Sequence, residues 1–248
     1  MKKQITAFFM AWGTYCAVPC PKKLWSEDAR VWTVVYLPVI GLLIGALWTL
    51  IIWAVNALHL PRFLAAALCT ASPFLLSGFF HLDGFMDCCD AILSRRDLPR
   101  RQEILKDSHV GSFAVICVAL LFLTEFAVFC DMDAVTRLTA FVLLPAAVRC
   151  ASALAVERLK PMKTSQFAGG FAEKKAKKQT VWLLVIFAAV IAAALLISDE
   201  ASLACGVGAF CAGMCAIANA KQLGGMNGDC AGCAVTVGEL AGLLSLLI

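Results

Sequence analysis

Three aspartates lie at helical spacing within the segment H-L-D-G-F-M-D-C-C-D-A. Asp83, Asp87 and Asp90 are four and three residues apart, which places them on one narrow stripe of a helix. Like charges at this spacing repel each other, so their clustering requires a compensating cation. Carboxylate oxygens, with no matching histidine or cysteine set, suit a hard ion such as Mg²⁺ or Mn²⁺. The spacing therefore predicts a metal site made by these three aspartates, with chemistry on a phosphorylated substrate.

A solvated helix end is the alternative interpretation of the same acids. Basic residues that could pair with them follow closely: Arg95, Arg96, Arg100 and Arg101. Gly84 favours the metal site, because a glycine inside a helix costs about 1 kcal/mol relative to alanine. A glycine here lets a phosphate or another backbone approach the acids.

The next polar segment is Lys106-Asp107-Ser108-His109. Lys106 is a candidate contact for a substrate phosphate. Asp107 could bind the metal, orient Lys106 or, like Asp90, accept a substrate proton. A helix start with Ser108 as N-cap explains the same spacing equally well. His81 and His109 are candidate bases or phosphate donors, and an interfacial histidine with a solvated ring is the alternative for each.

Three later segments add candidate substrate contacts. Arg149 lies inside an apolar block, where an arginine faces a cavity or a partner more often than lipid. Lys160 belongs to a basic loop that also contains Gly169 and Gly170 and could hold a nucleotide. Gly228 and Asp229 end the turn G-G-M-N-G-D, whose backbone N–H groups could meet phosphates. Glu239 in the last apolar block is either neutral and hydrogen-bonded or paired with Arg149, and the sequence leaves both open.

The elements that position these residues are membrane helices. The 248 residues are 61% hydrophobic and 15% charged, with a mean hydropathy of +0.85; a soluble domain has about 45–50% apolar and about 25% charged residues. We therefore expect one integral membrane domain over residues 1–248, an all-α polytopic helix bundle with about seven transmembrane helices. An interfacial helix is expected at 5–17. The apolar blocks are 32–57, 63–80, 110–130, 134–156, 180–198, 201–218 and 231–248.

The basic residues orient the chain in the bilayer. With a cytoplasmic N-terminus, the inside segments 1–31, 81–109, 158–179 and 219–230 hold almost all of the 21 lysines and arginines, and the outside turns hold only Arg62. This asymmetry predicts an inner membrane protein with its active site on the cytoplasmic side. The run Lys174, Lys175, Lys177 and Lys178 is interpreted as an anchor on anionic headgroups. No nucleic-acid motif is present, and the 13 cysteines are interpreted as packing residues in a reducing compartment.

The acidic segment, the segment R-R-Q-E-I-L-K-D-S-H-V-G-S-F and the turn G-G-M-N-G-D-C-A-G together resemble the signature segments of the cobalamin synthase family, the adenosylcobinamide-GDP ribazoletransferases. The likeness extends in the same order over most of the chain. It implies that Asp83, Asp87 and Asp90 match the family's acidic motif, Lys106 and Asp107 its K-D-S step, and Asp229 its glycine-Asp turn. The chain departs from the family at C-A-V-P-C-P, residues 16–21, where a basic threonine-arginine-type stretch is expected.

The resemblance implies the last condensation of the nucleotide loop of vitamin B12. Adenosylcobinamide-GDP would be joined to α-ribazole, or to its 5′-phosphate, with release of GMP and with Mg²⁺ as cofactor. A homo-oligomer or a complex with other cobalamin assembly enzymes stays open. A CDP-alcohol phosphotransferase is the nearest rival, but its second acidic half is missing here. A transporter, with Glu125, Arg149 and Glu239 along a pathway, is the rival of another class.

Overall fold

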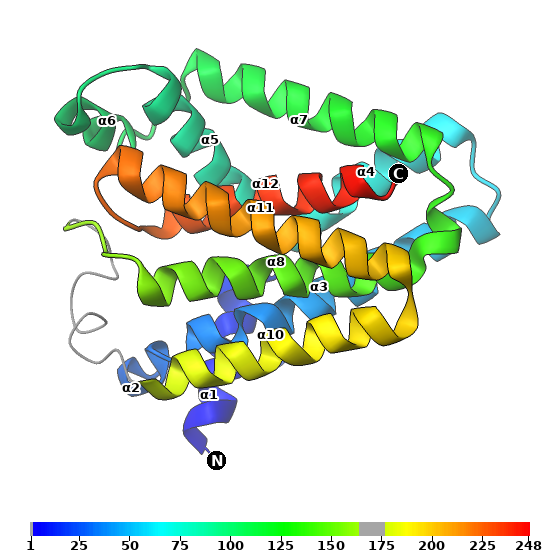
Figure 1. Ribbon diagram of the computed structural model, residues 1–248, viewed down its shortest axis with the longest axis horizontal. Coiled ribbons are helices and arrows are strands. Elements are labelled where there is room, and N and C mark those ends of the chain that lie inside the picture. The colour runs from blue at the N-terminus through cyan, green and yellow to red at the C-terminus, as the bar shows by residue number, and fades with distance from the viewer. Residues whose placement is uncertain (1, 164–176) are drawn as a thin grey trace.

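The structure of the protein is a computed structural model that describes residues 2–163 and 177–248. Every named element in these two ranges is a helix, and the helices pack into one elongated bundle (Figure 1). The elements are α1 (Lys2–Tyr15), α2 (Glu27–Arg30), α3 (Thr33–Ala57), α4 (Arg62–Leu76), α5 (Phe80–Leu93), α6 (Leu98–Ile104), α7 (Ser112–Asp131), the 3-10 helix η1 (Ala134–Arg137), α8 (Leu138–Arg158), α10 (Lys177–Ile197), α11 (Asp199–Leu223) and α12 (Gly228–Ser245).

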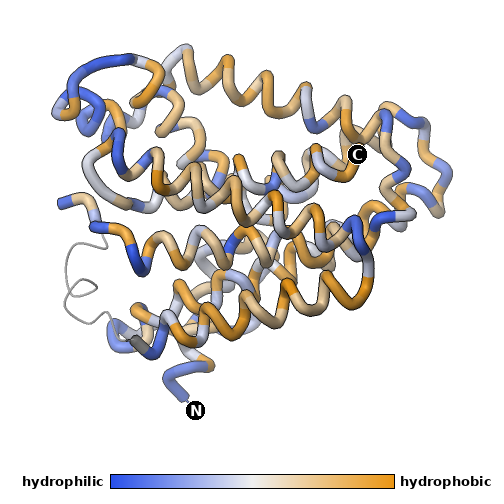
Figure 2. Tube along the Cα trace, viewed as in Figure 1, coloured by the Kyte–Doolittle hydropathy of each residue, from blue (hydrophilic) through white to orange (hydrophobic). Residues whose placement is uncertain are grey.

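Five helical segments are long and apolar enough to cross a membrane, and the bent pair α4 and α5 would make a sixth span. Apolar residues run along these helices and polar residues collect at the two ends of the bundle (Figure 2). The predicted all-α membrane bundle is therefore confirmed, but with fewer spans than the expected seven. The five segments are Thr33–Ala57, Ser112–Asp131, Ala134–Arg158, Lys178–Ile197 and Asp199–Leu223.

The block expected at 63–80 does not continue straight into the acidic helix. The axes of α4 and α5 differ by 92°. Gly78 and Phe79 make the break, with φ angles of 63° and 61° in the left-handed region. Such a conformation is rare for a residue that has a Cβ atom. Because of this break, α5 runs at nearly a right angle to α4 and packs on α12 and α7.

The predicted seventh span corresponds to α12, which packs against α11, α5 and α8. Gly208, Gly238 and Gly242 lie at these interfaces, and a Cβ atom on any of them would come within 2.9 Å of a neighbouring helix. These glycines let the helices pack closely against one another inside the bundle. Gly206 and Gly213 are exceptions, since a Cβ atom there would meet nothing within 4 Å.

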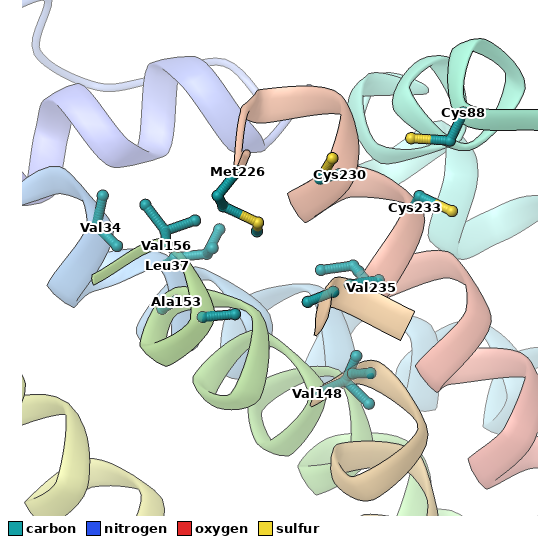
Figure 3. Packing of buried hydrophobic residues seen from close by; sticks show 14 of the residues in the cluster. Val34, Leu37, Cys88, Val148, Ala153, Val156, Met226, Cys230, Cys233 and Val235 are labelled. Carbon is teal, nitrogen blue, oxygen red and sulfur yellow. The ribbon is translucent and has the colours of Figure 1, made fainter. Parts of the chain in front are cut away.

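One end of the bundle gathers α6, the last turns of α8 and α11 and the first turn of α12; we call it the α6 end (left in Figure 1). Near the α6 end, Cys88 of α5 lies beside Cys230 and Cys233 of α12 in the largest apolar cluster (Figure 3). All thirteen cysteines are free thiols. The structure therefore contains the packing cysteines that the sequence predicted.

Candidate active site

Two glycines bring the acidic helix α5 onto the start of α12. A Cβ atom on Gly84 would lie 2.8 Å from the Cα atom and the carbonyl oxygen of Asp229. A Cβ atom on Gly232 would lie 2.9 Å from the carbonyl oxygen of His81. The backbones therefore touch where only glycine fits. This contact places Asp229 beside the acids of α5, although 142 to 146 residues separate them in the sequence (229−87 and 229−83).

Asp83, Asp87 and Asp229 form what we call the acidic cluster. Asp87 is half-buried and experiences the charges of Asp229, Asp83 and Asp90, in that order of strength. Asp83 is exposed and Asp229 is half-buried. The cluster is thus open to solvent on one side and enclosed by α5 and α12 on the other.

The arginines that follow α5 do not neutralise this cluster. In residues 2–163 and 177–248, none of Arg95, Arg96, Arg100 and Arg101 forms an ion pair with an acid of the cluster. Arg100 pairs instead with Glu103 at 2.6 Å. The structure therefore lacks the acid–arginine pairs that the alternative of a solvated helix end required.

Asp90, predicted as both ligand and base, has another contact. One carboxylate oxygen accepts the backbone N–H of Gly111 at 2.7 Å, and the other accepts that of Ala114 at 3.0 Å. These N–H groups belong to the open first turn of α7, which a carboxylate stabilises. Asp90 therefore fastens the start of α7 to α5, and the spacing that placed it on the acidic stripe gave no sign of this.

The turn before α12 holds Asp229 in place. The Asn227 side chain accepts the backbone N–H of Cys230 at 2.9 Å as the N-cap of α12 and donates to Asp229 at 2.6 Å. The sequence interpretation missed Asn227. An asparagine directly before Gly228 at the start of an apolar block is the signal that would have found it, because asparagine is a preferred N-cap.

A parallel bridge joins this turn to the chain after α8. The Met226 N–H donates to the Lys160 carbonyl at 2.8 Å, and the Met162 N–H donates to the Met226 carbonyl at 2.9 Å. Gly225 makes this approach possible, since its φ is 153° and a Cβ atom would lie 2.5 Å from the Met162 nitrogen. The predicted substrate contacts Lys160 and Gly228 therefore lie at the same end of the bundle. Gly169, Gly170, Lys174 and Lys175 lie outside the described residues.

Helix α6 docks on the last turn of α11. The Gln102 side chain donates to the Leu223 carbonyl at 2.8 Å, and Arg101 donates to the Gln222 carbonyl at 3.4 Å. Both satisfy carbonyls that a helix end leaves unpaired. Gln102 is a second residue that the sequence did not single out. Its contact fixes α6 and the exposed Lys106 that follows it at the α6 end.

Asp107 and His109 bond to each other at the surface. The His109 backbone N–H donates to the Asp107 carboxylate at 3.0 Å, and the His109 ring nitrogen Nδ1 lies 2.7 Å from the same oxygen. The backbone bond, followed by the ring contact, lowers the pKa of Asp107 below its usual value. A carboxylate with a lowered pKa is a weaker base. This geometry favours Asp107 as the group that orients His109.

His81 and Arg149 lie deeper, away from solvent. Arg149 is 1% exposed and donates to Glu239 at 2.5 Å, which decides between the two states that the sequence left open for Glu239. His81 is buried against the ring of Tyr15, with centroids 6.2 Å apart and an interplanar angle of 15°. Both side chains therefore lie inside the bundle, where Arg149 of α8 pairs with α12 and His81 of α5 packs against α1.

The donor set fits a divalent cation only in part. Within the described residues, no three acidic, histidine or cysteine side chains are placed to hold a metal alone. Mg²⁺ usually takes one or two protein carboxylates and completes its shell with water and substrate phosphates. Unpaired, partly exposed carboxylates are compatible with that mode of binding.

The Gly84→Ala variant tests the contact between α5 and α12. The new methyl group has only backbone to displace, so we expect overpacking to cost about 1–3 kcal/mol of stability. Because Asp229 shifts relative to Asp87, activity should fall on the order of 100-fold. Gly213→Ala is the matched control, since its methyl group enters open space. Steady-state rates and thermal unfolding of both variants would measure this, and equal activity of the two would contradict it.

The family model described as cobalamin-5-phosphate synthase matches residues 7–247. An adenosylcobinamide-GDP ribazoletransferase of Clostridium perfringens is 36% identical over 251 aligned positions, covering 99% of both chains. That of Clostridium botulinum is 34% identical, covering 99% of this chain and 98% of the relative. No solved structure matches. The match of nearly the whole chain, acidic helix and glycine turn included, shows that the chain belongs to the cobalamin-5-phosphate synthase family.

Proposed function

We propose that this chain joins adenosylcobinamide-GDP to α-ribazole or its 5′-phosphate and releases GMP. Its relatives are named for this transfer. The observation that carries the proposal is the acidic cluster: three carboxylates from two distant segments, without an ion pair in the described part of the chain. A diphosphate with a counterion is the kind of substrate that such a cluster accommodates.

The acidic cluster is our proposed Mg²⁺ site, with Asp229 in place of Asp90. Both oxygens of Asp90 already accept N–H groups of α7, whereas Asp83, Asp87 and Asp229 have free acceptor positions. When bound, the ion would supply charge stabilisation to the diphosphate. The three carboxylates would hold that ion, and Asn227 keeps Asp229 in position.

The cationic side chains at the α6 end hold the nucleotide in this proposal. Lys106 and Lys160 are exposed, and neither forms an ion pair with a described residue. Each can donate to a phosphate of the GDP group. Backbone N–H groups around Gly228 at the start of α12 add donors for the same anion. Together these groups favour departure of GMP.

The attacking hydroxyl group of the ribazole ribose must lose a proton. His109 has an exposed ring, and Asp107 holds it through Nδ1, so the second ring nitrogen can accept that proton. An aspartate that orients a histidine base is a recurring catalytic arrangement. In this division of roles Lys106 contacts phosphate, Asp107 is a positioning residue and Asp90 fastens α7.

We place the acidic cluster on the cytoplasmic side of a bacterial inner membrane. Basic residues gather at the α6 end, and the opposite end carries Asp131, Asp133 and Asp199. Positive charge on the cytoplasmic side is the general rule for membrane proteins. That residues 1–248 form a single domain stays a prediction. Self-association, or a complex with other cobalamin assembly enzymes, also stays a prediction.

Incubating purified protein in lipid nanodiscs with adenosylcobinamide-GDP, α-ribazole and Mg²⁺ tests the function. We expect one GMP for each completed cobalamin and no product after chelation of Mg²⁺. Transfer from a CDP-activated lipid instead, or no GMP in the presence of both substrates, would overturn the proposal. Retained activity with EDTA would overturn only the assignment of the metal.

A further inference from the structure

Four thiol groups meet where α5, α11 and α12 pack together, and we call them the thiol cluster. Cys88 belongs to α5, Cys215 to α11, and Cys230 and Cys233 to α12. The sulfur atoms of Cys215 and Cys233 lie 3.8 Å apart, and the Cys88 thiol contacts both Cys230 and Cys233. Figure 3 shows Cys88, Cys230 and Cys233 together where α5 meets α12. The proposed transfer uses none of these sulfur atoms.

The close approach of α11 and α12 brings Cys215 and Cys233 together. A cysteine side chain is short, so two sulfur atoms meet only where the backbones themselves are near. Gly208 and Gly238 allow that approach, since a Cβ atom on Gly238 would lie 2.8 Å from the Gly208 carbonyl oxygen. A disulfide bond is about 2.05 Å long. The two sulfur atoms must therefore approach by about 1.8 Å (3.8 − 2.05), which side-chain rotation can supply.

Cys215 is the member of the thiol cluster that an oxidant can reach. It is partly exposed, whereas Cys88, Cys230 and Cys233 are buried. The Asn219 side-chain amide donates to the Cys215 sulfur at 3.5 Å, and such a donor favours the negatively charged sulfur. A partly exposed thiol with a hydrogen-bond donor and a second thiol in contact has the surroundings of a redox-sensitive cysteine.

The thiol cluster and the acidic cluster share the contact between α5 and α12. Cys233 follows Asp229 by four residues, about one turn of α12. Gly232, directly before Cys233, packs on the backbone of α5, where its Cβ atom would lie 2.9 Å from the His81 carbonyl oxygen. The Cys88 thiol touches Cys233 from the same side. A pull on Cys233 toward α11 therefore acts on the turn that holds Asp229 against α5.

We propose that Cys215 and Cys233 are a modification site, at which a hydroperoxide forms a reversible disulfide. The new bond draws α12 toward α11 and withdraws Asp229 from Asp83 and Asp87, so the transfer is slow while the disulfide persists. This consequence rests on the proposed function, whereas the disulfide itself does not. Disulfides in intracellular proteins are usually transient and often sense the redox state.

The reaction consumes one hydroperoxide and two thiols. The Cys215 thiolate attacks the terminal oxygen of the hydroperoxide, the O–O bond breaks, and the leaving alkoxide takes up the proton that the thiol released. Cys215 is then a sulfenic acid. The Cys233 sulfur attacks the Cys215 sulfur, an S–S bond forms, and the hydroxyl group leaves as water with the Cys233 proton. Two electrons pass from the sulfur atoms to the peroxide, and a dithiol reductant returns them by exchange.

Thiol mapping of the full chain in nanodiscs tests the modification. Reduced protein is treated with cumene hydroperoxide, the remaining thiols are alkylated, and the peptides are identified by mass spectrometry. We expect a cross-linked peptide that joins Cys215 to Cys233. A cross-link between other cysteines of the wild-type chain, or oxidation of Cys215 without a cross-link, would overturn the proposal.

Cys215→Ser and Cys211→Ser are the matched variants. Cys211 lies one turn earlier on α11, is also partly exposed and, among the described residues, bonds to no other thiol. Cys211→Ser should therefore form the same cross-link as the wild-type chain, and Cys215→Ser should not. Loss of the cross-link in both variants would contradict a specific pairing of Cys215 with Cys233.

The rate of ribazole transfer tests the consequence for activity. The cross-linked wild-type protein should be at least about tenfold slower than the reduced protein, and dithiothreitol should restore the rate. Oxidised methionine would persist in dithiothreitol, so recovery identifies the disulfide. An unchanged rate after complete cross-linking, or an equal loss in Cys215→Ser, would overturn this consequence. Because the cross-link is read without turnover, a cross-linked chain whose reduced form releases no GMP would contradict the proposed function alone.

Discussion

Replacing Asp87 by asparagine is expected to lower ribazole transfer on the order of 10²–10³-fold while the bundle stays folded. Asp87 is half-buried and experiences the charges of all the other acids near it. The amide keeps the shape of the side chain but removes its negative charge, so the loss of rate measures what the charge contributes. When the rate of GMP release is measured at increasing Mg²⁺ concentration, the variant should need more Mg²⁺ to reach half of its maximal rate.

Two further variants make this result specific. Asp131→Asn removes an exposed carboxylate at the opposite end of the bundle and should leave the rate unchanged. Asp90→Asn weakens the bonds to Gly111 and Ala114, so it should reduce stability without changing the Mg²⁺ dependence. If Asp87→Asn turns over normally and with an unchanged Mg²⁺ dependence, the metal site does not lie on the acidic cluster.

Replacing Arg149 by methionine is expected to destabilise the protein by about 3–5 kcal/mol. The Arg149 guanidinium is 1% exposed and bonds both Glu239 and the Pro145 carbonyl. Methionine removes the cation and leaves Glu239 inside the bundle without its partner, close to the carboxyl group of Glu125. The midpoint of thermal unfolding in nanodiscs would measure the loss.

The double variant Arg149→Met/Glu239→Leu separates pairing from packing. Replacing a whole buried pair by apolar residues is often neutral, whereas removing one partner is costly. We therefore expect the double variant to recover most of the stability. Arg158→Met, an exposed position at the end of the same helix, is the control. A double variant as unstable as Arg149→Met would show that Arg149 acts through its other contacts.

This ion pair also bears on function, because it joins α8 to the helix that carries Asp229. Glu239 lies ten residues after Asp229 on α12, and the two helices pack together along this stretch. Charges that the transporter interpretation placed along a pathway therefore hold two helices together. The same helices position the acidic cluster at the α6 end.

The sequence by itself established that the protein lies in a membrane and which residues could carry its chemistry. Long apolar blocks require a membrane, because so much apolar surface cannot be buried in one soluble core. The spacing of Asp83 and Asp87 on a helix follows from the helical period alone. Family motifs over most of the chain then indicated the reaction. These properties are local or summed along the chain, so no knowledge of packing is needed.

Only the tertiary structure decided which acidic side chains lie close together. Helical spacing put Asp90 with the other acids, but the fold uses it to fasten α7 and supplies Asp229 from a segment far along the chain. The approach of Asp229 to α5 depends on Gly84 and Gly232. The need for glycine at these two positions is visible only in the contact between α5 and α12. The break at Gly78 and Phe79 likewise ends the block expected at 63–80 and separates α4 from the acidic helix α5. The physical reason is the same in each case: periodicity states which residues share a face, and close packing decides which faces meet.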